Sequence, residues 1–158
     1  MTESLKPEIQ AQLDTLISQF DVADGMLLML LKEVEKLFNY SLPTGVLDYL
    51  SRKLDMPLSK LYGVVTFYSL FSTQPRGKHI IRLCDSPPCH LMGSDSILDF
   101  LKNYLKINVG ETTQDGKFTL ELSSCLGICA VAPAMMINDD MHGNLTPSKI
   151  KEILANLA

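Results

Sequence analysis

Four cysteines, grouped in two pairs in the second half of the chain, are the residues whose types and spacing best suit chemistry. Cys84 and Cys89 are separated by four residues, and Cys125 and Cys129 are separated by three. Four thiolates that converge on one site bind zinc or an iron-sulfur cluster. A chain of 158 residues buries enough surface to fold without disulfides. The two pairs therefore predict a metal site.

The spacing within each pair helps to choose between these metals. Structural zinc sites usually hold two cysteines through a tight two-residue turn, whereas the intervening segments here are longer. A two-iron cluster is a wider object in which each iron needs two thiolates, so it tolerates longer ligand loops. The spacing favours an iron-sulfur cluster. Two alternatives stay open: a structural zinc-binding interaction module, and a thioredoxin-like dithiol oxidoreductase with unligated thiols.

The sequence around both pairs contains no cation. Neither the segment from Leu83 to Leu101 nor that from Phe118 to Ser148 includes a Lys or Arg. A catalytic thiolate is usually stabilised by a nearby positive charge, so this composition disfavours a nucleophilic cysteine. An anionic cluster in such surroundings accepts an electron less readily, which predicts a low reduction potential.

The first part of the chain has helical periodicity. Apolar residues recur on one helical face in several segments, as Val46, Leu50 and Leu54 illustrate. We expect helices over residues 13–20, 26–38, 46–54 and 58–68. The turn-forming residues 74–77 then interrupt the pattern. This predicts a helical N-terminal region over residues 1–75 and a second domain over residues 76–158.

The second part alternates strands and helices. We expect a strand over 79–84, a helix over 96–105, a strand over 118–123, and a hairpin of strands 134–138 and 141–145 that turns around Asp139 and Asp140. Thr146 is placed to cap a last helix that begins at Pro147. The predicted class is α+β, with α/β-like features: an N-terminal helical bundle, then a thioredoxin-like four-stranded sheet with flanking helices, in which a loop replaces the helix before the third strand.

This order of elements brings the cysteines together. Each pair directly follows a strand, and the first two strands are joined by a helix, as in a parallel βαβ unit. Both pairs therefore emerge at the same carboxyl-terminal edge of the sheet.

A longer pattern resembles a known family. It consists of Cys84-x4-Cys89-x3-Gly93, then Gly110-Glu111, then residues 115–120, then Cys125-Leu126-Gly127-x-Cys129-x3-Pro133, and upstream residues 65–68. It is similar to the thioredoxin-like 2Fe-2S ferredoxin family, over nearly the whole chain. That family includes the 24 kDa subunit of respiratory NADH dehydrogenase and the small subunits of NAD(P)-linked hydrogenases and formate dehydrogenases.

The resemblance implies a ligand set. Cys84, Cys89, Cys125 and Cys129 would hold one 2Fe-2S cluster, with one iron for each pair, and the chain would have no catalytic residue of its own. One departure is Pro87-Pro88 inside the first ligand loop, because prolines supply no N–H donor to the cluster.

The resemblance also implies a function. The chain would be an electron-transfer iron-sulfur subunit of a multisubunit NAD(P)H-linked flavin oxidoreductase and would not be catalytic alone. Its partners would be a subunit that binds FMN, NAD(P) and its own iron-sulfur cluster, and a further electron-acceptor subunit. The 2Fe-2S cluster would accept or store one of the two hydride electrons. A soluble or electron-bifurcating hydrogenase-type complex is slightly favoured over the respiratory complex.

Composition excludes several other classes. The chain has 14 Lys and Arg against 18 Asp and Glu, and a net charge of −4 is unsuited to nucleic acid or an anionic membrane surface. No N-terminal signal region and no apolar run of about 18 residues is present, so we expect no membrane insertion and a location in the cytoplasm, or on the cytoplasmic side of a membrane complex. No glycine-rich phosphate loop occurs, which places nucleotide chemistry on a partner.

Two other residues lie close to the cysteines in sequence. His90 follows a cysteine, but four thiolates already complete the ligand set, so we expect this histidine to face solvent or to pack. Pro133 precedes a predicted strand of a thioredoxin-like core and is a candidate for a cis peptide bond.

Overall fold

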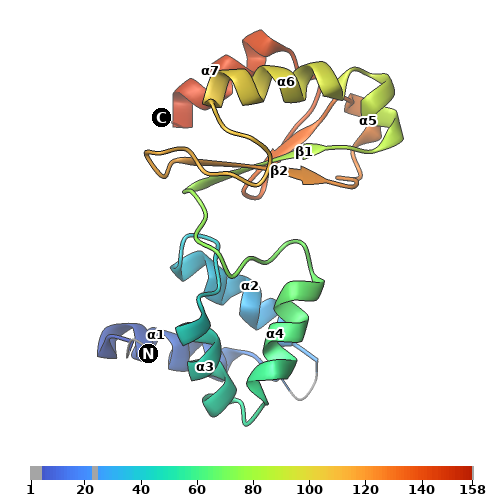
Figure 1. Ribbon diagram of the computed structural model, residues 1–158. Coiled ribbons are helices and arrows are strands. Elements are labelled where there is room, and N and C mark those ends of the chain that lie inside the picture. The colour runs from blue at the N-terminus through green and yellow to red at the C-terminus, as the bar shows by residue number, and fades with distance from the viewer. Residues whose placement is uncertain (1–4, 23–24, 158) are drawn as a thin grey trace. The chain divides into compact units, whose positions relative to one another are not determined.

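The computed structural model describes residues 5–22 and 25–157. The chain divides into two compact units, Met1–Pro75 and Arg76–Ala158, each with its own hydrophobic core (Figure 1). No described helix has the length and apolar content needed to cross a bilayer.

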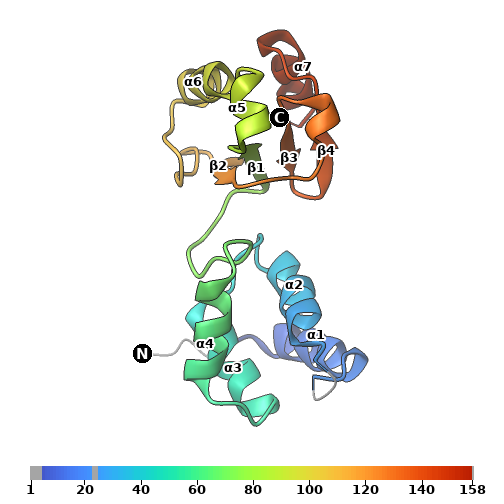
Figure 2. The same ribbon diagram turned by 90° about the vertical axis from the view of Figure 1, so that its right-hand side faces the viewer.

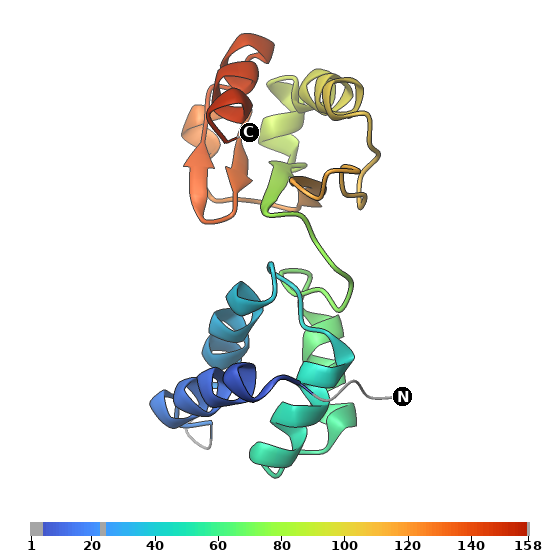
Figure 3. The same cartoon turned by 90° about the vertical axis from the view of Figure 1, so that its left-hand side faces the viewer.

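The first unit consists of helices, as predicted. They are α1 (Pro7–Gln19), α2 (Leu27–Leu37), α3 (Thr44–Lys53) and α4 (Leu58–Phe67). Helix α1 lies beside α2, and α3 packs against α4 (Figure 3). The fully buried side chains that join them are mainly leucines: Leu13, Leu30, Leu31, Leu42, Leu47, Leu50 and Leu61. Helix α1 begins before the predicted segment because Pro7 occupies its first turn, where a missing N–H costs nothing.

The second unit is a four-stranded mixed sheet. Its strands are β1 (His79–Cys84), β2 (Phe118–Ser123), β3 (Met135–Ile137) and β4 (Asp140–His142), in the order β2-β1-β3-β4 (Figure 2). Strands β1 and β2 are parallel, and the other two pairs are antiparallel. This arrangement confirms the predicted α+β class.

Two helices cover one face of the sheet. Helix α6 (Ser94–Leu105) connects β1 to β2, and α7 (Pro147–Leu157) follows the β3-β4 hairpin; both lie on the same face (Figure 1). The core between helices and sheet contains Ile81, Leu83, Leu101, Leu120, Met135, Ile150 and Leu154. Thr146 caps α7 as predicted, since its Oγ1 accepts a hydrogen bond from the Lys149 N–H (3.2 Å).

Two short helical segments were not predicted. Helix α5 (Pro87–Leu91) and the 3-10 turn η1 (Cys129–Val131) lie in the two cysteine loops. The prolines favour α5, because they are pre-set for a first turn whose N–H groups have no partner within the helix. The His90 N–H closes that turn on the Ser86 carbonyl (2.9 Å).

The β3-β4 turn is placed one residue earlier than predicted. Asn138 has a φ of 54° and forms the turn with Asp139, so Asp140 begins β4. Asparagine tolerates this left-handed conformation better than most residues. Strand β4 is also shorter than predicted, and Asn144 beyond it again has a positive φ, 50°. The Ala132–Pro133 peptide bond, the candidate noted in the sequence, is cis.

Candidate metal centre

The ends of β1 and β2 determine where both cysteine pairs lie. Cys84 is the last residue of β1 and is paired in register with Ser123, the last residue of β2. The Asp85 N–H donates to the Ser123 carbonyl (2.8 Å) and extends the pairing one step further. Cys125 follows two residues after β2 ends. The two cysteine loops therefore start side by side at one edge of the sheet, as predicted.

The first pair is buried. Cys84 and Cys89 are 2% and 1% exposed, and they form a small apolar cluster with Ala132 and Ala134. Helix α5 turns Cys89 back toward the end of β1, and the two thiols are hydrogen-bonded to each other. Their sulfurs are thus close enough to bind one metal ion together.

The second pair is exposed. Cys125 and Cys129 lie in the loop after β2, and their thiols are also hydrogen-bonded to each other. Gly127 between them has a φ of +77°, a conformation that favours glycine. Its N–H donates to the Cys125 sulfur (3.4 Å). The turn at Gly127 therefore folds the loop so that the two thiols of this pair meet.

Hydrogen bonds link the first pair to the segments around it. The Leu126 N–H, from the second cysteine loop, donates to the Cys84 sulfur, and the Ala134 N–H, just before β3, donates to the Cys89 sulfur. The Ser86 hydroxyl is hydrogen-bonded to the Cys84 sulfur at 3.2 Å. The two loops are consequently in direct contact at the sulfurs.

The thiols have perturbed pKa values that report this crowding. Burial raises the pKa of Cys84, but hydrogen bonds from Ser86, Leu126 and Cys89 outweigh it, so the net effect is a lowered pKa. Burial and the hydrogen bond with Cys84 raise the pKa of Cys89. Desolvation, and then the charges of Cys125 and Cys84, raise the pKa of Cys129. Several thiolates at one edge repel one another, and a bound metal would offset that repulsion.

The sulfurs do not converge on a single point. Among the described residues, the one group of three or more ligand atoms within 4.8 Å of one another is that of Asp85, His90 and Asp95, which contains no cysteine. In a tetrahedral zinc site with Zn–S distances of about 2.3 Å, the sulfurs lie about 3.8 Å apart. Two close pairs at one edge match the wider two-iron arrangement better, with one iron for each pair.

The donor set fits a 2Fe-2S cluster. The edge supplies four thiols as ligands, and Leu126, Gly127 and Ala134 direct N–H groups at sulfurs, which is how proteins commonly tune such clusters. The prolines of α5 supply no N–H, but both are exposed at the start of that helix. Their lack of donors is therefore compensated by donors from other segments.

His90 is exposed, as expected. Its Nδ1 lies 3.1 Å from a carboxylate oxygen of Asp95, in a pair in which both side chains are more than half exposed. The histidine thus has a partner at the surface and is not directed at the cysteines.

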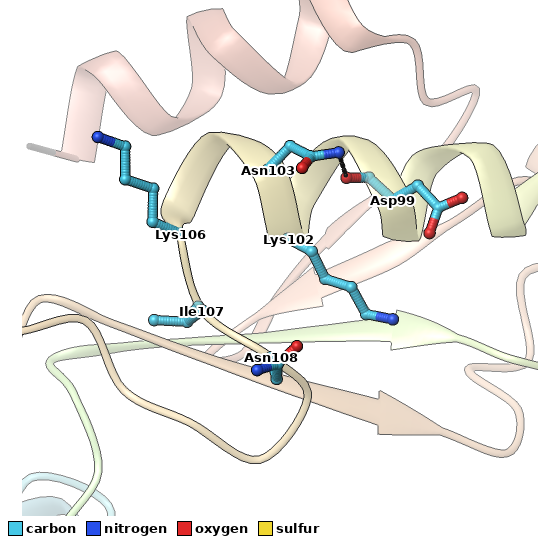
Figure 4. A pocket seen from close by; sticks show the side chains of 6 residues that line it. All are labelled: Asp99, Lys102, Asn103, Lys106, Ile107 and Asn108. Carbon is cyan, nitrogen blue, oxygen red and sulfur yellow. Dashed lines mark hydrogen bonds between the residues drawn. The ribbon is translucent and has the colours of Figure 1, made fainter.

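A surface pocket lies away from the cysteine edge. Figure 4 shows it at the C-terminal half of α6, where its lining contains charged groups of both signs: Asp99, Lys102, Asn103, Lys106, Ile107 and Asn108. The Asn103 side-chain amide donates to the Asp99 carbonyl within the same helix (2.9 Å). No cysteine contributes to this pocket, so it is separate from the candidate metal centre.

Comparison with known proteins agrees with this geometry. The sequence model of the thioredoxin-like 2Fe-2S ferredoxin family matches residues 13–158. The chain belongs to this family. The matched span includes all four cysteines and most of the helical unit, and the family binds a 2Fe-2S cluster.

Several relatives are components of redox complexes. The chain is 37% identical over 132 residues to the NADP-reducing hydrogenase subunit HndA of Solidesulfovibrio fructosivorans, covering 84% of this chain and 77% of that protein. It is 37% identical over 148 residues to a NADH-quinone oxidoreductase subunit of Aquifex aeolicus, covering 94% and 92%. It is 46% identical over 112 residues to the NADH-quinone oxidoreductase subunit of the same name from Escherichia coli strain K12, covering 71% and 68%.

Two solved structures of NAD+-reducing NiFe hydrogenase share the fold. The air-oxidised form has a TM-score of 0.69 at 21% identity and covers 80% of this chain. The H2-reduced form has a TM-score of 0.67 at 18% identity and covers 98%. This chain spans only 22% and 23% of those longer chains, so the comparison concerns the fold alone.

Three donors were missed by reasoning from the sequence. Gly127 was predicted to bring backbone close to the cluster, but Ser86, Leu126 and Ala134 were not assigned to it. Ser86 lies between the cysteines of the first pair, and its position offered a signal. Leu126 and Ala134 act through backbone N–H groups, which residue type does not reveal.

Gly127 provides a test of the loop geometry. An alanine forced into a left-handed conformation costs about 1 kcal/mol, so Gly127→Ala should displace the second cysteine pair and lower the iron and sulfide retained per chain to about half of the wild-type value. Gly116 is a matched control, because it also has a positive φ (+70°) and space for a Cβ but lies in a turn away from the cysteines.

Gly116→Ala should lower the free energy of unfolding by a similar amount while retaining full iron and sulfide. Equal metal content in the two purified variants would contradict the role assigned to the Gly127 turn.

Proposed function

We propose that this chain is an electron-transfer subunit whose cysteines Cys84, Cys89, Cys125 and Cys129 hold one 2Fe-2S cluster. It would act within a multisubunit NAD(P)H-linked oxidoreductase, in the cytoplasm or on the cytoplasmic side of a membrane complex. The chain supplies the ligands and their surroundings, and the oxidation of NAD(P)H belongs to a partner subunit that binds FMN and nucleotide.

The observation that supports this proposal best is the meeting of two cysteine pairs at one sheet edge. Each pair is internally hydrogen-bonded, and the Leu126 N–H of the second loop reaches the Cys84 sulfur of the first. When bound, a 2Fe-2S cluster supplies a carrier for single electrons. The protein buries one pair of ligands and exposes the other, so the exposed side is open to a redox partner.

The two alternative functions fit the geometry less well. A zinc module needs four sulfurs around one point, and the described cysteines are arranged as two separate pairs. A thioredoxin-like dithiol needs an accessible thiol with a lowered pKa. Here the thiol with the lowered pKa, Cys84, is buried, and the exposed Cys129 has a raised pKa.

The partner proposal is supported by the relatives and by the surface beside the site. The relatives are named as subunits of an NADP-reducing hydrogenase and of NADH-quinone oxidoreductases. In this chain, Leu91 and Met92 follow Cys89 directly and are 85% and 61% exposed. Exposed apolar side chains at this density mark interaction surfaces. We therefore assign the docking surface of the flavin-binding subunit to the end of α5.

The cluster assignment is tested by Cys125→Ser in the full-length chain. Wild-type protein that is purified anaerobically should contain two iron and two sulfide per chain and should show one electron paramagnetic resonance signal after reduction. Replacing a ligand thiolate by a hydroxyl should abolish or shift that signal. Ser124→Ala, at the exposed neighbouring position, should leave the signal unchanged.

Each alternative predicts a different result from the same protein. Stoichiometric zinc with no visible absorption would refute the cluster and support the zinc module. Reduction of insulin disulfides that survives in Cys125→Ser would support the dithiol oxidoreductase.

The docking surface is tested by Leu91→Asp in affinity-tagged protein purified from its native host. A charge at this apolar position should reduce the flavin-containing protein that co-purifies by about tenfold, the effect expected for a central interface residue. Val109→Asp is the control, because Val109 is also exposed and apolar but lies in the loop after α6. Equal losses of flavin for the two variants, or no loss for Leu91→Asp, would contradict the assignment.

A further inference from the structure

Three charged side chains form a buried group in the second unit. The Nε atoms of Arg76 and Arg82 lie 2.8 Å and 3.0 Å from the two carboxylate oxygens of Glu121. The arginine side chains are only 5% and 9% exposed, and that of Glu121 is 19% exposed. Buried charges are rare in proteins, so this group invites a functional explanation.

The strand register places this group next to the candidate metal centre. Arg82 and Glu121 are paired across β1 and β2, and the next same-face pair toward the edge is Cys84 and Ser123. Side chains two residues apart on a strand lie on the same face, about 7 Å apart along the chain. The guanidinium group of Arg82 is therefore on the same face of the sheet as the sulfur of Cys84.

The three side chains together have one excess positive charge. Two guanidinium groups stay protonated at all physiological pH values, and one carboxylate balances only one of them. Because the group is buried, solvent and salt screen its field less than they screen a surface charge. The sequence predicted surroundings free of cations, but it could not show that Arg76 and Arg82 are brought together just before the cation-free segment begins.

We propose that the Arg76-Glu121-Arg82 group raises the reduction potential of the cluster held by the four cysteines. This inference rests on the proposed function. A 2Fe-2S cluster with four thiolate ligands is doubly negative when both irons are ferric, and it gains a third negative charge when one electron is added. The excess positive charge stabilises the reduced form more than the oxidised form, so the potential is higher than the cation-free sequence predicts.

The electron balance of the step is simple. In the complex, one electron leaves the reduced flavin of the partner subunit and enters the cluster, and no bond to this chain forms or breaks. In an experiment, dithionite supplies the electron through mediators. The three side chains remain charged throughout and act by their field.

The test changes the net charge of the group in both directions in the full-length, cluster-loaded chain. Arg82→Gln reduces the net charge of the group to zero, and Glu121→Gln increases it to two positive charges. Midpoint potentials are measured by redox titration of the paramagnetic signal. Arg82→Gln should shift the one-electron equilibrium about tenfold toward the oxidised form, a decrease of about 59 mV, and Glu121→Gln should shift it in the opposite direction.

Two control variants separate charge from structure. Arg82→Lys keeps the charge and should stay near the wild-type potential, even where its packing differs. Lys78→Gln removes an exposed charge six residues before Cys84, roughly 20 Å away along the strand, and should cause no shift. If Arg82→Gln fails to bind a cluster, Glu121→Gln and Arg82→Lys still test the sign of the effect.

The outcomes distinguish this inference from the proposed function. Potentials ordered Glu121→Gln, then wild type, then Arg82→Gln support the inference. A normal signal with unchanged potentials, or with shifts of the same sign in both charge variants, overturns it and leaves the proposed function intact. Absence of the signal from the wild-type protein itself overturns both.

Discussion

The parallel pairing of β1 and β2 is the interaction on which the candidate metal centre depends. Register between these strands places Cys84 opposite Ser123, and the Asp85 N–H continues the ladder beyond the last pair. The loops that follow the two strands must therefore start at neighbouring points. From there, α5 returns Cys89 to Cys84, and the turn at Gly127 brings the second pair together. A shift in register by one residue would move Cys84 to the other face of the sheet and separate the pairs.

The sequence predicted most of the architecture because periodicity and turn residues are local signals. Helical spacing identified the helices of the first unit, and the strands before each cysteine pair placed both pairs at one edge. The misses have physical reasons. Helix α5 begins with two prolines, which read as a loop but suit a helical first turn. The β3-β4 turn is determined by the left-handed conformation of Asn138, one of several polar residues able to form it. Donors such as the Ala134 N–H belong to the backbone, and residue type gives no sign of where they point.

Charge illustrates the same limit. Reading along the chain, the cysteines are surrounded by acidic and neutral residues, and a low reduction potential follows. In the folded unit, Arg82 lies on the same face as Cys84, and Arg76 joins it through Glu121. The field at the site is thus determined by residues that strand pairing and a loop contact assemble. A thioredoxin-like fold is used here without the exposed reactive thiol of an oxidoreductase, since Cys84 and Cys89 are buried within an apolar cluster and are hydrogen-bonded to each other.

Iron-edge X-ray absorption of the anaerobically purified full-length chain tests the central claim most directly, because it reports the neighbours of each iron. We predict four sulfur neighbours and one iron neighbour for every iron, as two metal ions that each bind one cysteine pair require. Iron with four sulfur neighbours but no iron neighbour would contradict the assignment. So would a chain that contains no iron and has zinc bound to its cysteines.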